Sequence, residues 1–203
     1  MFPDRKDAGI QLAEKLKMYS NKNCIVLGIP RGGVPVAYEI SKELDLPLDI
    51  LPAKKIGHPA NKEYAIGAVS PDDEYIIPQH DVPESYLNSE KAAIRKRIKE
   101  MQVLYGSRMT SDYLQEKTVI VVDDGIATGN TVIAGIQYLR KAGVNKIRVA
   151  APVMSQQAYQ KINNLADETI SLLIPDYFGG VGAFYEHFGQ ISDEEVITIL
   201  ENC

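Results

Sequence analysis

Two adjacent carboxylates, Asp123 and Asp124, stand between a run of β-branched residues and a loop of small ones. The run 119–122 (Val-Ile-Val-Val) is typical of a buried parallel strand, which would deliver both carboxylates to its carboxyl end. The loop 125–131 follows, and a helical pattern begins at about Asn130. Because free N–H groups at a helix N-terminus bind anions, the sequence predicts a phosphate site in this loop.

Two carboxylates beside a phosphate would repel it unless the ligand also brings hydroxyl groups and a metal ion. Carboxylates accept hydrogen bonds from a ribose diol, and Mg²⁺ neutralises the remaining charge. A single ligand that carries a ribose diol and a 5′-phosphate would therefore satisfy both halves of the stretch.

Residues 119–131 resemble the phosphoribosyl-pyrophosphate (PRPP) signature of type I phosphoribosyltransferases, which is a hydrophobic strand, two acids and a small-residue loop ending in Thr-Gly-x-Thr. The alternative is a plain strand–turn–helix of a doubly wound sheet. A Walker loop needs a Gly-Lys-Ser/Thr ending and a Rossmann fingerprint needs Gly-x-Gly-x-x-Gly, and neither occurs here. The resemblance implies that Asp123 and Asp124 are catalytic, holding the ribose hydroxyls and Mg²⁺ directly or indirectly. It assigns the 5′-phosphate to Gly125, Ile126, Ala127, Thr128, Gly129, Asn130 and Thr131.

A second candidate site is the turn that follows the predicted strand 23–28. Arg31 precedes two glycines at the carboxyl end of this strand, where open α/β sheets bind ligands. By resemblance this loop binds pyrophosphate, with Arg31 as a catalytic residue and bidentate phosphate partner. The basic segment 54–62 would also bind the pyrophosphate. The alternative is that this segment is a solvated loop. The predicted pyrophosphate-binding residues are Pro30, Arg31, Gly32, Gly33, Lys54 and Lys55.

Strand and helix patterns alternate from residue 25 to residue 173, which predicts an α/β fold: a doubly wound, mostly parallel sheet with helices on both faces. The predicted strands are 23–28, 48–52, 119–122, 146–153 and 168–173; the predicted helices are 4–19, 36–44, 130–141 and 156–165. We expect a single domain over 1–203. It would contain a flap insertion at 54–110 and a C-terminal hood segment at 175–203, by resemblance to the same family.

The insertion combines short strands at 64–69 and 74–77 with a long basic helix that starts near residue 83 or 89 and ends at 105. This helix is either a solvated or dimer-forming surface, or part of a flap that closes over PRPP. Arg108, just beyond it, is a further candidate for facing the site.

The tail 176–190 interleaves aromatic residues with glycines, before a capped helix at 192–200. Tyr177, Phe184 and Tyr185 are predicted to stack on an acceptor base, and the alternative is that they pack the tail onto the core. The tail, the Arg31 loop and the Lys54 segment extend the resemblance to a family of bacterial phosphoribosyltransferase-domain proteins of unassigned substrate.

The composition narrows the class of protein. A net charge of −5 counts against nucleic-acid binding, and two cysteines at opposite ends of the sequence give no disulfide framework or zinc site. With no apolar run of membrane-spanning length and no signal pattern, a cytoplasmic protein without a membrane partner is expected.

The predicted function is Mg²⁺-dependent transfer of the 5-phosphoribosyl group from PRPP to a nitrogenous base, with release of pyrophosphate. The alternative is a PRPP-binding regulator without turnover. Enzymes of the resembling family that act on 6-oxopurines usually carry Asp where Ala127 stands, so adenine- and uracil-type acceptors remain open. Dimers are common in the resembling fold, but no residue of this sequence proves a homodimer.

Overall fold

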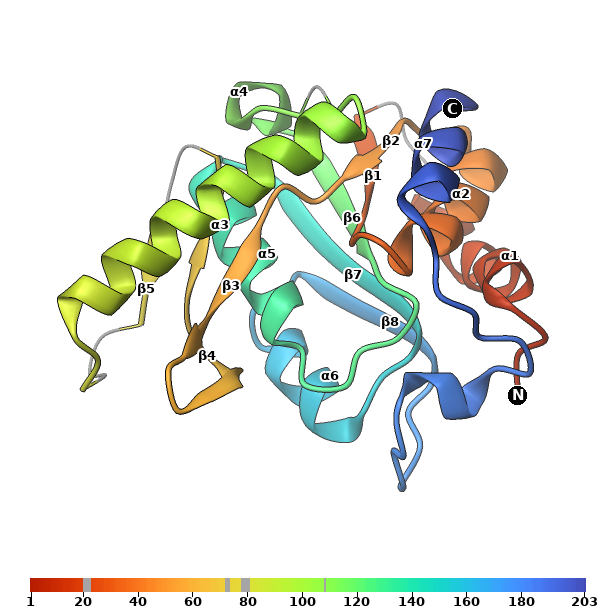
Figure 1. The fold of residues 1–203 in the computed structure, drawn as a ribbon. Coiled ribbons are helices and arrows are strands. Elements are labelled where there is room, and N and C mark those ends of the chain that lie inside the picture. Colours follow the sequence, from red (N-terminus) through yellow and green to blue (C-terminus); the bar gives the residue numbers. More distant parts are fainter. Residues whose placement is uncertain (20–22, 72–73, 78–80, 108) are drawn as a thin grey trace.

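Five parallel strands form the central sheet of the computed structural model, in the order β2-β1-β6-β7-β8 (Figure 1). They are β1 (Cys24–Gly28), β2 (Leu48–Ile50), β6 (Thr118–Val122), β7 (Lys146–Val153) and β8 (Glu168–Leu173). The structure describes residues 1–19, 23–71, 74–77, 81–107 and 109–203. The predicted α/β fold with a parallel sheet is therefore confirmed.

The strand order reverses between β1 and β6, since β2 lies on one side of β1 and β6 to β8 lie on the other. Gly28 at the end of β1 is in register with Val122 at the end of β6, and the Ile29 N–H donates to the Val122 carbonyl at 2.8 Å. The loops after these two strands consequently start side by side, at the switch point where open α/β sheets bind ligands.

Helices cover both faces of the central sheet. Helices α1 (Arg5–Leu16) and α2 (Gly33–Leu44) pack on one face, and α5 (Asn130–Lys141) and α6 (Gln156–Asn163) pack on the other. Successive residues of β6 alternate between the two cores, as Val119 and Ile120 do. This burial on both faces explains why the strand sequence is continuously hydrophobic rather than alternating.

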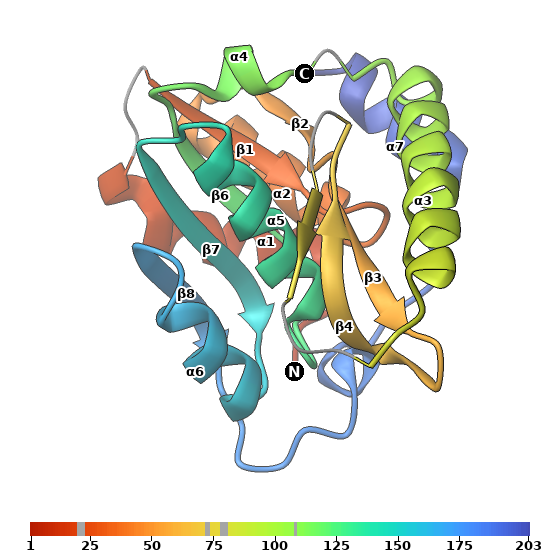
Figure 2. The same cartoon turned by 90° about the vertical axis from the view of Figure 1, so that its left-hand side faces the viewer.

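The residues between β2 and β6 form a second, antiparallel sheet, β3-β4-β5, made of β3 (Lys54–His58), β4 (Asn61–Val69) and β5 (Glu74–Ile76). A solvated loop was one alternative for the basic segment that starts at residue 54. Residues 54–58 instead form a strand that pairs with β4. Figure 2 shows α5 between the two sheets and the long α3 (Glu84–Leu104) along the outer side of the small one. Ile98 of α3 packs on Ile56 and Ile66, and the short α4 (Ser111–Leu114) leads back to β6.

The C-terminal segment passes the start of the chain before it ends in α7 (Asp193–Glu201), which begins with a Ser192–Glu195 capping box. Phe2 donates to the Phe184 carbonyl and accepts from the Glu186 N–H, both at 2.8 Å. The short 3-10 helices η1 (Lys17–Tyr19) and η2 (Val181–Phe184) complete the described elements. Within the part of the chain that the structure covers, no helix combines the length and apolarity needed to cross a membrane.

Candidate active site

The loop after β6 encloses a small cavity of about 120 Å³ at the N-terminus of α5. Its lining consists of Asp123 and residues 125–132, which include all seven residues predicted to hold a phosphate. Gly129 caps the helix with a φ of 75°, a left-handed conformation that glycine adopts without strain. The cavity therefore brings together backbone N–H groups, the Thr128 and Thr131 side chains and one carboxylate, a set that fits a sugar phosphate.

The two adjacent carboxylates have different environments. Asp123 is half-buried and lines the phosphate cavity, whereas Asp124 is only 8% exposed and does not line it. The Oδ2 atom of Asp124 lies 2.8 Å from Nε of Arg5, in a buried ion pair. Burial, followed by the neighbouring Asp124 charge, raises the pKa of Asp123 well above the usual aspartate range. A cation near Asp123 would favour the ionised carboxylate and so oppose this rise in its pKa.

The loop after β1 packs directly against the start of the β6 loop. A Cβ atom on Gly33 would lie 2.6 Å from the Val122 carbonyl oxygen and 2.9 Å from Cα of Asp123. A Cβ atom on Gly32 would lie 2.1 Å from Oδ2 of Asp124. These glycines are therefore needed for the contact between the two loops. The peptide bond between Pro30 and Arg31 is cis.

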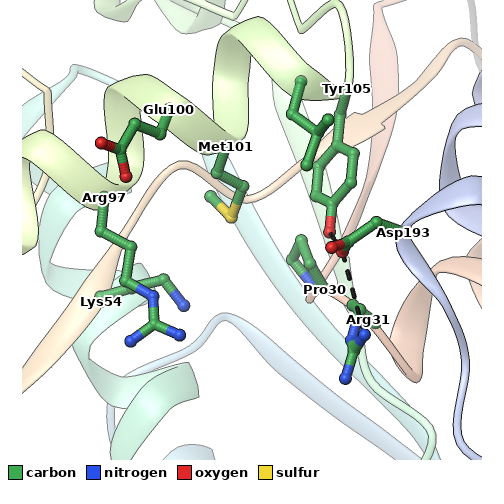
Figure 3. Close-up of a pocket in the computed structure, with 9 residues that line it drawn as sticks. Pro30, Arg31, Lys54, Arg97, Glu100, Met101, Tyr105 and Asp193 are labelled. Atoms are coloured by element: carbon green, nitrogen blue, oxygen red, sulfur yellow. Dashed lines mark hydrogen bonds and ion pairs between the residues drawn. The ribbon is translucent and has the colours of Figure 1, made fainter.

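A larger cavity of about 460 Å³ opens beside this loop, under α3 (Figure 3). Three cationic side chains line it: Arg31 from the β1 loop, Lys54 from β3 and Arg97 from α3. Burial, followed by the Arg97 charge, lowers the pKa of Lys54. Among the described residues no carboxylate forms an ion pair with Lys54 or Arg97. The cavity consequently suits a polyanion such as pyrophosphate.

An acidic side chain closes one side of this basic cavity. Asp193, the first residue of α7, lies 3.9 Å from the Arg31 guanidinium, and the Tyr105 hydroxyl donates to it at 2.5 Å. Figure 3 shows these three side chains grouped on one side, with Lys54 and Arg97 on the other. Lys55 does not line the cavity, because successive residues of a strand point to opposite faces.

Sequence reasoning placed Arg97 only within a basic helix surface and gave no role to Arg5, Tyr105 or Asp193. The cluster of cations along 91–99 was the one available signal for Arg97. Two of its neighbours, Lys91 and Arg95, pair with Glu74 instead, at 2.9 and 2.6 Å. The other predicted candidate on this side, Arg108, lies outside the described residues.

The aromatic tail residues also separate into different environments. Tyr177 is 85% exposed, while Phe184 is half-buried with its ring centroid 5.4 Å from that of Phe178. Tyr185 is buried between Phe2 and Phe188, and its hydroxyl donates to the Asp124 carbonyl at 2.6 Å. Tyr185 thus packs the tail onto the core, the alternative that the sequence had left open, and its ring is not presented to a ligand.

No group of three or more His, Cys, Asp or Glu side chains that would suffice for a metal ion occurs among the residues that the structure describes. Asp123 is nevertheless a half-buried carboxylate at the edge of an anion cavity. This donor set fits Mg²⁺, which is usually held by one or two carboxylates together with substrate phosphates.

At the switch point of its parallel sheet the structure therefore carries a small-residue loop at a helix N-terminus, an acidic pair and a basic cavity. The chain belongs to the phosphoribosyl transferase domain family, whose sequence model matches residues 3–186.

A Mycobacterium tuberculosis protein, named provisionally as a phosphoribosyl transferase, is 37% identical over an alignment that covers 100% of this chain and 47% of that protein. The chain spans about half the length of the curated relatives it matches. A crystal structure of a Thermus thermophilus protein covers 99% of this chain and 98% of its own, at 35% identity and a TM-score of 0.88. A purine phosphoribosyltransferase from Pyrococcus horikoshii shares the fold, with 20% identity, coverage of 93% and 92%, and a TM-score of 0.50.

Proposed function

We propose that this chain transfers the 5-phosphoribosyl group of PRPP to a nitrogenous base and releases pyrophosphate, in a reaction that requires Mg²⁺. The observation that carries the proposal is the juxtaposition, at the switch point, of two cavities whose lining suits anions. The phosphate cavity of residues 125–131 and the basic cavity of Arg31 begin from loops that touch, and Asp123 lies where they meet.

The two ends of PRPP match these two sites. The 5′-phosphate would bind the N–H and hydroxyl groups of the β6 loop, and the pyrophosphate would bind Arg31, Lys54, Arg97 and the main chain of residues 32–33. Hydrogen bonds to charged oxygens contribute roughly 1.5–3 kcal/mol each, so a few of them suffice to hold the substrate. Asp123 lines the phosphate cavity, and it would there accept hydrogen bonds from the ribose hydroxyls.

In the reaction, the bond between C1′ and the pyrophosphate oxygen breaks, and its electron pair stays on that oxygen. A ring nitrogen of the acceptor forms the new bond to C1′ and gives up its proton to water or to the released pyrophosphate. The protein contributes positioning of both ends and cations at the oxygen where negative charge develops. Asp123, with Asp124 acting indirectly, would hold Mg²⁺, and the bound ion would supply positive charge that neutralises part of this negative charge.

The acceptor would bind beyond C1′, under the C-terminal hood. Tyr177 and Phe184 remain candidates for stacking on a flat base, and Tyr185 would act indirectly by holding the tail against Asp124. Ala127 is exposed at the phosphate loop, and it provides no carboxylate for the ring of a 6-oxopurine. We therefore expect an acceptor of adenine or uracil type.

Phosphorus NMR of Mg²⁺ and PRPP with the protein and pooled nucleobases tests the proposal. We expect new pyrophosphate and nucleotide signals that require a base, and splitting the pool then identifies the acceptor. Asp123→Asn should reduce both signals, whereas Asp112→Asn, an exposed acid in α4 before the amino end of β6, should not. PRPP signals that broaden without product would favour the PRPP-binding regulator. PRPP signals that do not change at all would contradict both functions.

A further inference from the structure

Arg5 is a buried cation at the first helical position of α1, far in sequence from both candidate loops. Asp4 caps this helix by accepting the Asp7 N–H, and the next residue, Arg5, is buried. Its Nε atom lies 2.8 Å from Oδ2 of Asp124, and Nη1 donates to the Gly189 carbonyl at 2.8 Å. Its guanidinium carbon lies 3.9 Å from the ring centroid of Phe188. Arg5 therefore joins the N-terminal helix, the β6 loop and the C-terminal tail at one carboxylate.

We propose that Arg5 is a positioning residue for the pyrophosphate loop, and that it acts through Asp124. The inference rests on the proposed function and goes beyond it, because it assigns the two adjacent carboxylates different tasks. Asp123 faces the ligand, and Asp124 supports the loop that holds the pyrophosphate.

The contact between Asp124 and Gly32 is the physical basis of this assignment. A Cβ atom on Gly32 would lie 2.1 Å from Oδ2 and 2.7 Å from Cγ of Asp124, so the carboxylate fills the space beside the Gly32 main chain. The rotamer of Asp124 thus limits where residues 31–33 can lie. Arg5 fixes that rotamer, because a guanidinium holds a carboxylate at a defined angle as well as by charge.

The C-terminal tail also holds Asp124, through its main chain. The Tyr185 hydroxyl donates to the Asp124 main-chain carbonyl at 2.6 Å, and the Tyr185 ring stacks on Phe188 with centroids 5.0 Å apart. Phe188 in turn lies against Arg5. Asp124 is consequently held by its side chain and by its main chain, in a position where it touches the pyrophosphate loop and not the phosphate cavity.

Loss of Arg5 would leave a buried carboxylate without its counter-ion, which is unfavourable. Asp124 would then turn toward solvent, away from its place beside Gly32. The pyrophosphate loop would lose its support even though every residue that contacts the ligand is unchanged. Binding of pyrophosphate alone, with no ribose present, should therefore weaken.

Calorimetry with Mg²⁺-pyrophosphate and with Mg²⁺-PRPP tests the proposal on the full chain. We expect Arg5→Met to weaken Mg²⁺-pyrophosphate binding about tenfold, equivalent to about 1.4 kcal/mol. Arg5→Lys, which keeps the charge but not the planar fork, should recover part of the affinity. In an Asp124→Asn background, where the buried charge is already gone, Arg5→Met should change the affinity less than about twofold, since coupled residues are not additive.

Arg148→Met is a matched control. Arg148 is also buried, with a 3.2 Å ion pair to Glu168 and a guanidinium 4.3 Å from the Tyr19 ring centroid, but it lies toward the amino end of β7, away from the site. It should lower the melting temperature and leave both dissociation constants unchanged.

The outcomes separate this inference from the function itself. If the unsubstituted chain binds neither ligand, the proposed function fails and the Arg5 inference with it. If the unsubstituted chain binds both ligands and Arg5→Met binds Mg²⁺-pyrophosphate as tightly, only the Arg5 inference is overturned. Equal effects of Arg5→Met in the two backgrounds would also overturn it, because Arg5 would then not act through Asp124.

Discussion

Replacement of Arg97 by Met tests whether α3 takes part in the site. Arg97 lines the basic cavity with Lys54 and Arg31. From the sequence, the helix that carries it could have been either a solvated surface or part of a flap. Methionine keeps much of the length and apolar stem of the side chain and removes its charge. We expect weaker binding of Mg²⁺-pyrophosphate with little change in stability, since Arg97 is exposed.

The size of the effect follows from the cavity. A hydrogen bond to a charged oxygen contributes roughly 1.5–3 kcal/mol, and an exposed donor such as Arg97 falls at the lower end of that range. The expected result is a dissociation constant raised about tenfold, which corresponds to about 1.4 kcal/mol.

Isothermal titration with Mg²⁺-pyrophosphate measures this change, and Lys96→Met is the matched control. Lys96 is the preceding residue of α3, is exposed, lies 3.8 Å from Glu100 and does not line the cavity. Both variants change the net charge equally, so a long-range effect would appear in both and diminish with added salt. Equal affinities for Arg97→Met, Lys96→Met and the unsubstituted chain would refute the reasoning and remove α3 from the site.

Two further predictions concern stability. Tyr185→Phe keeps the ring stack but leaves the Asp124 carbonyl without its 2.6 Å hydrogen bond. It should therefore lower the free energy of unfolding by about 1–3 kcal/mol and the melting temperature, measured by calorimetry, by several degrees. Tyr177→Phe, at an exposed ring, should leave the melting temperature unchanged, and equal melting temperatures for the two variants would contradict the role assigned to Tyr185. Glu74, whose pKa is lowered chiefly by its bond to Lys91, contributes stability that is present above the ordinary glutamate pKa of about 4.3 and is lost as the pH falls through the lower folded-state pKa. Glu74→Gln should therefore lower the free energy of unfolding at pH 7 by up to about 1 kcal/mol and lower the melting temperature accordingly. In acid the melting temperatures of the two proteins should converge. A difference independent of pH would argue against the ion pairs.

Local pattern was enough to predict the elements that carry the site. The β-branched run before Asp123 is typical of a buried central strand and forms β6, and the small residues after it form the turn into α5. The loop 125–131 therefore lies at the carboxyl end of β6, as the sequence indicated. The same reasoning placed the Arg31 turn at the end of β1, because strand and helix periods alternate regularly up to that point.

Local pattern failed where the partner of a residue is distant along the chain. Arg5 resembles any charged residue in the first turn of a surface helix, and only the folded chain brings it to Asp124, 119 residues away. Tyr185 was equally suited to stack on a base or to fill the core, and its burial against Phe2 depends on the path of the tail.

The sequence by itself predicted where the two loops lie and what they could bind, because the conformation of such a loop depends on its own glycines, hydroxyls and flanking strand and helix. Only the tertiary structure decided which of the two carboxylates lines the cavity of the β6 loop, and which cations line a cavity with Arg31. Those outcomes depend on how α1, α3 and the tail pack, and packing is a sum of many weak contacts between distant residues that no single stretch of sequence encodes.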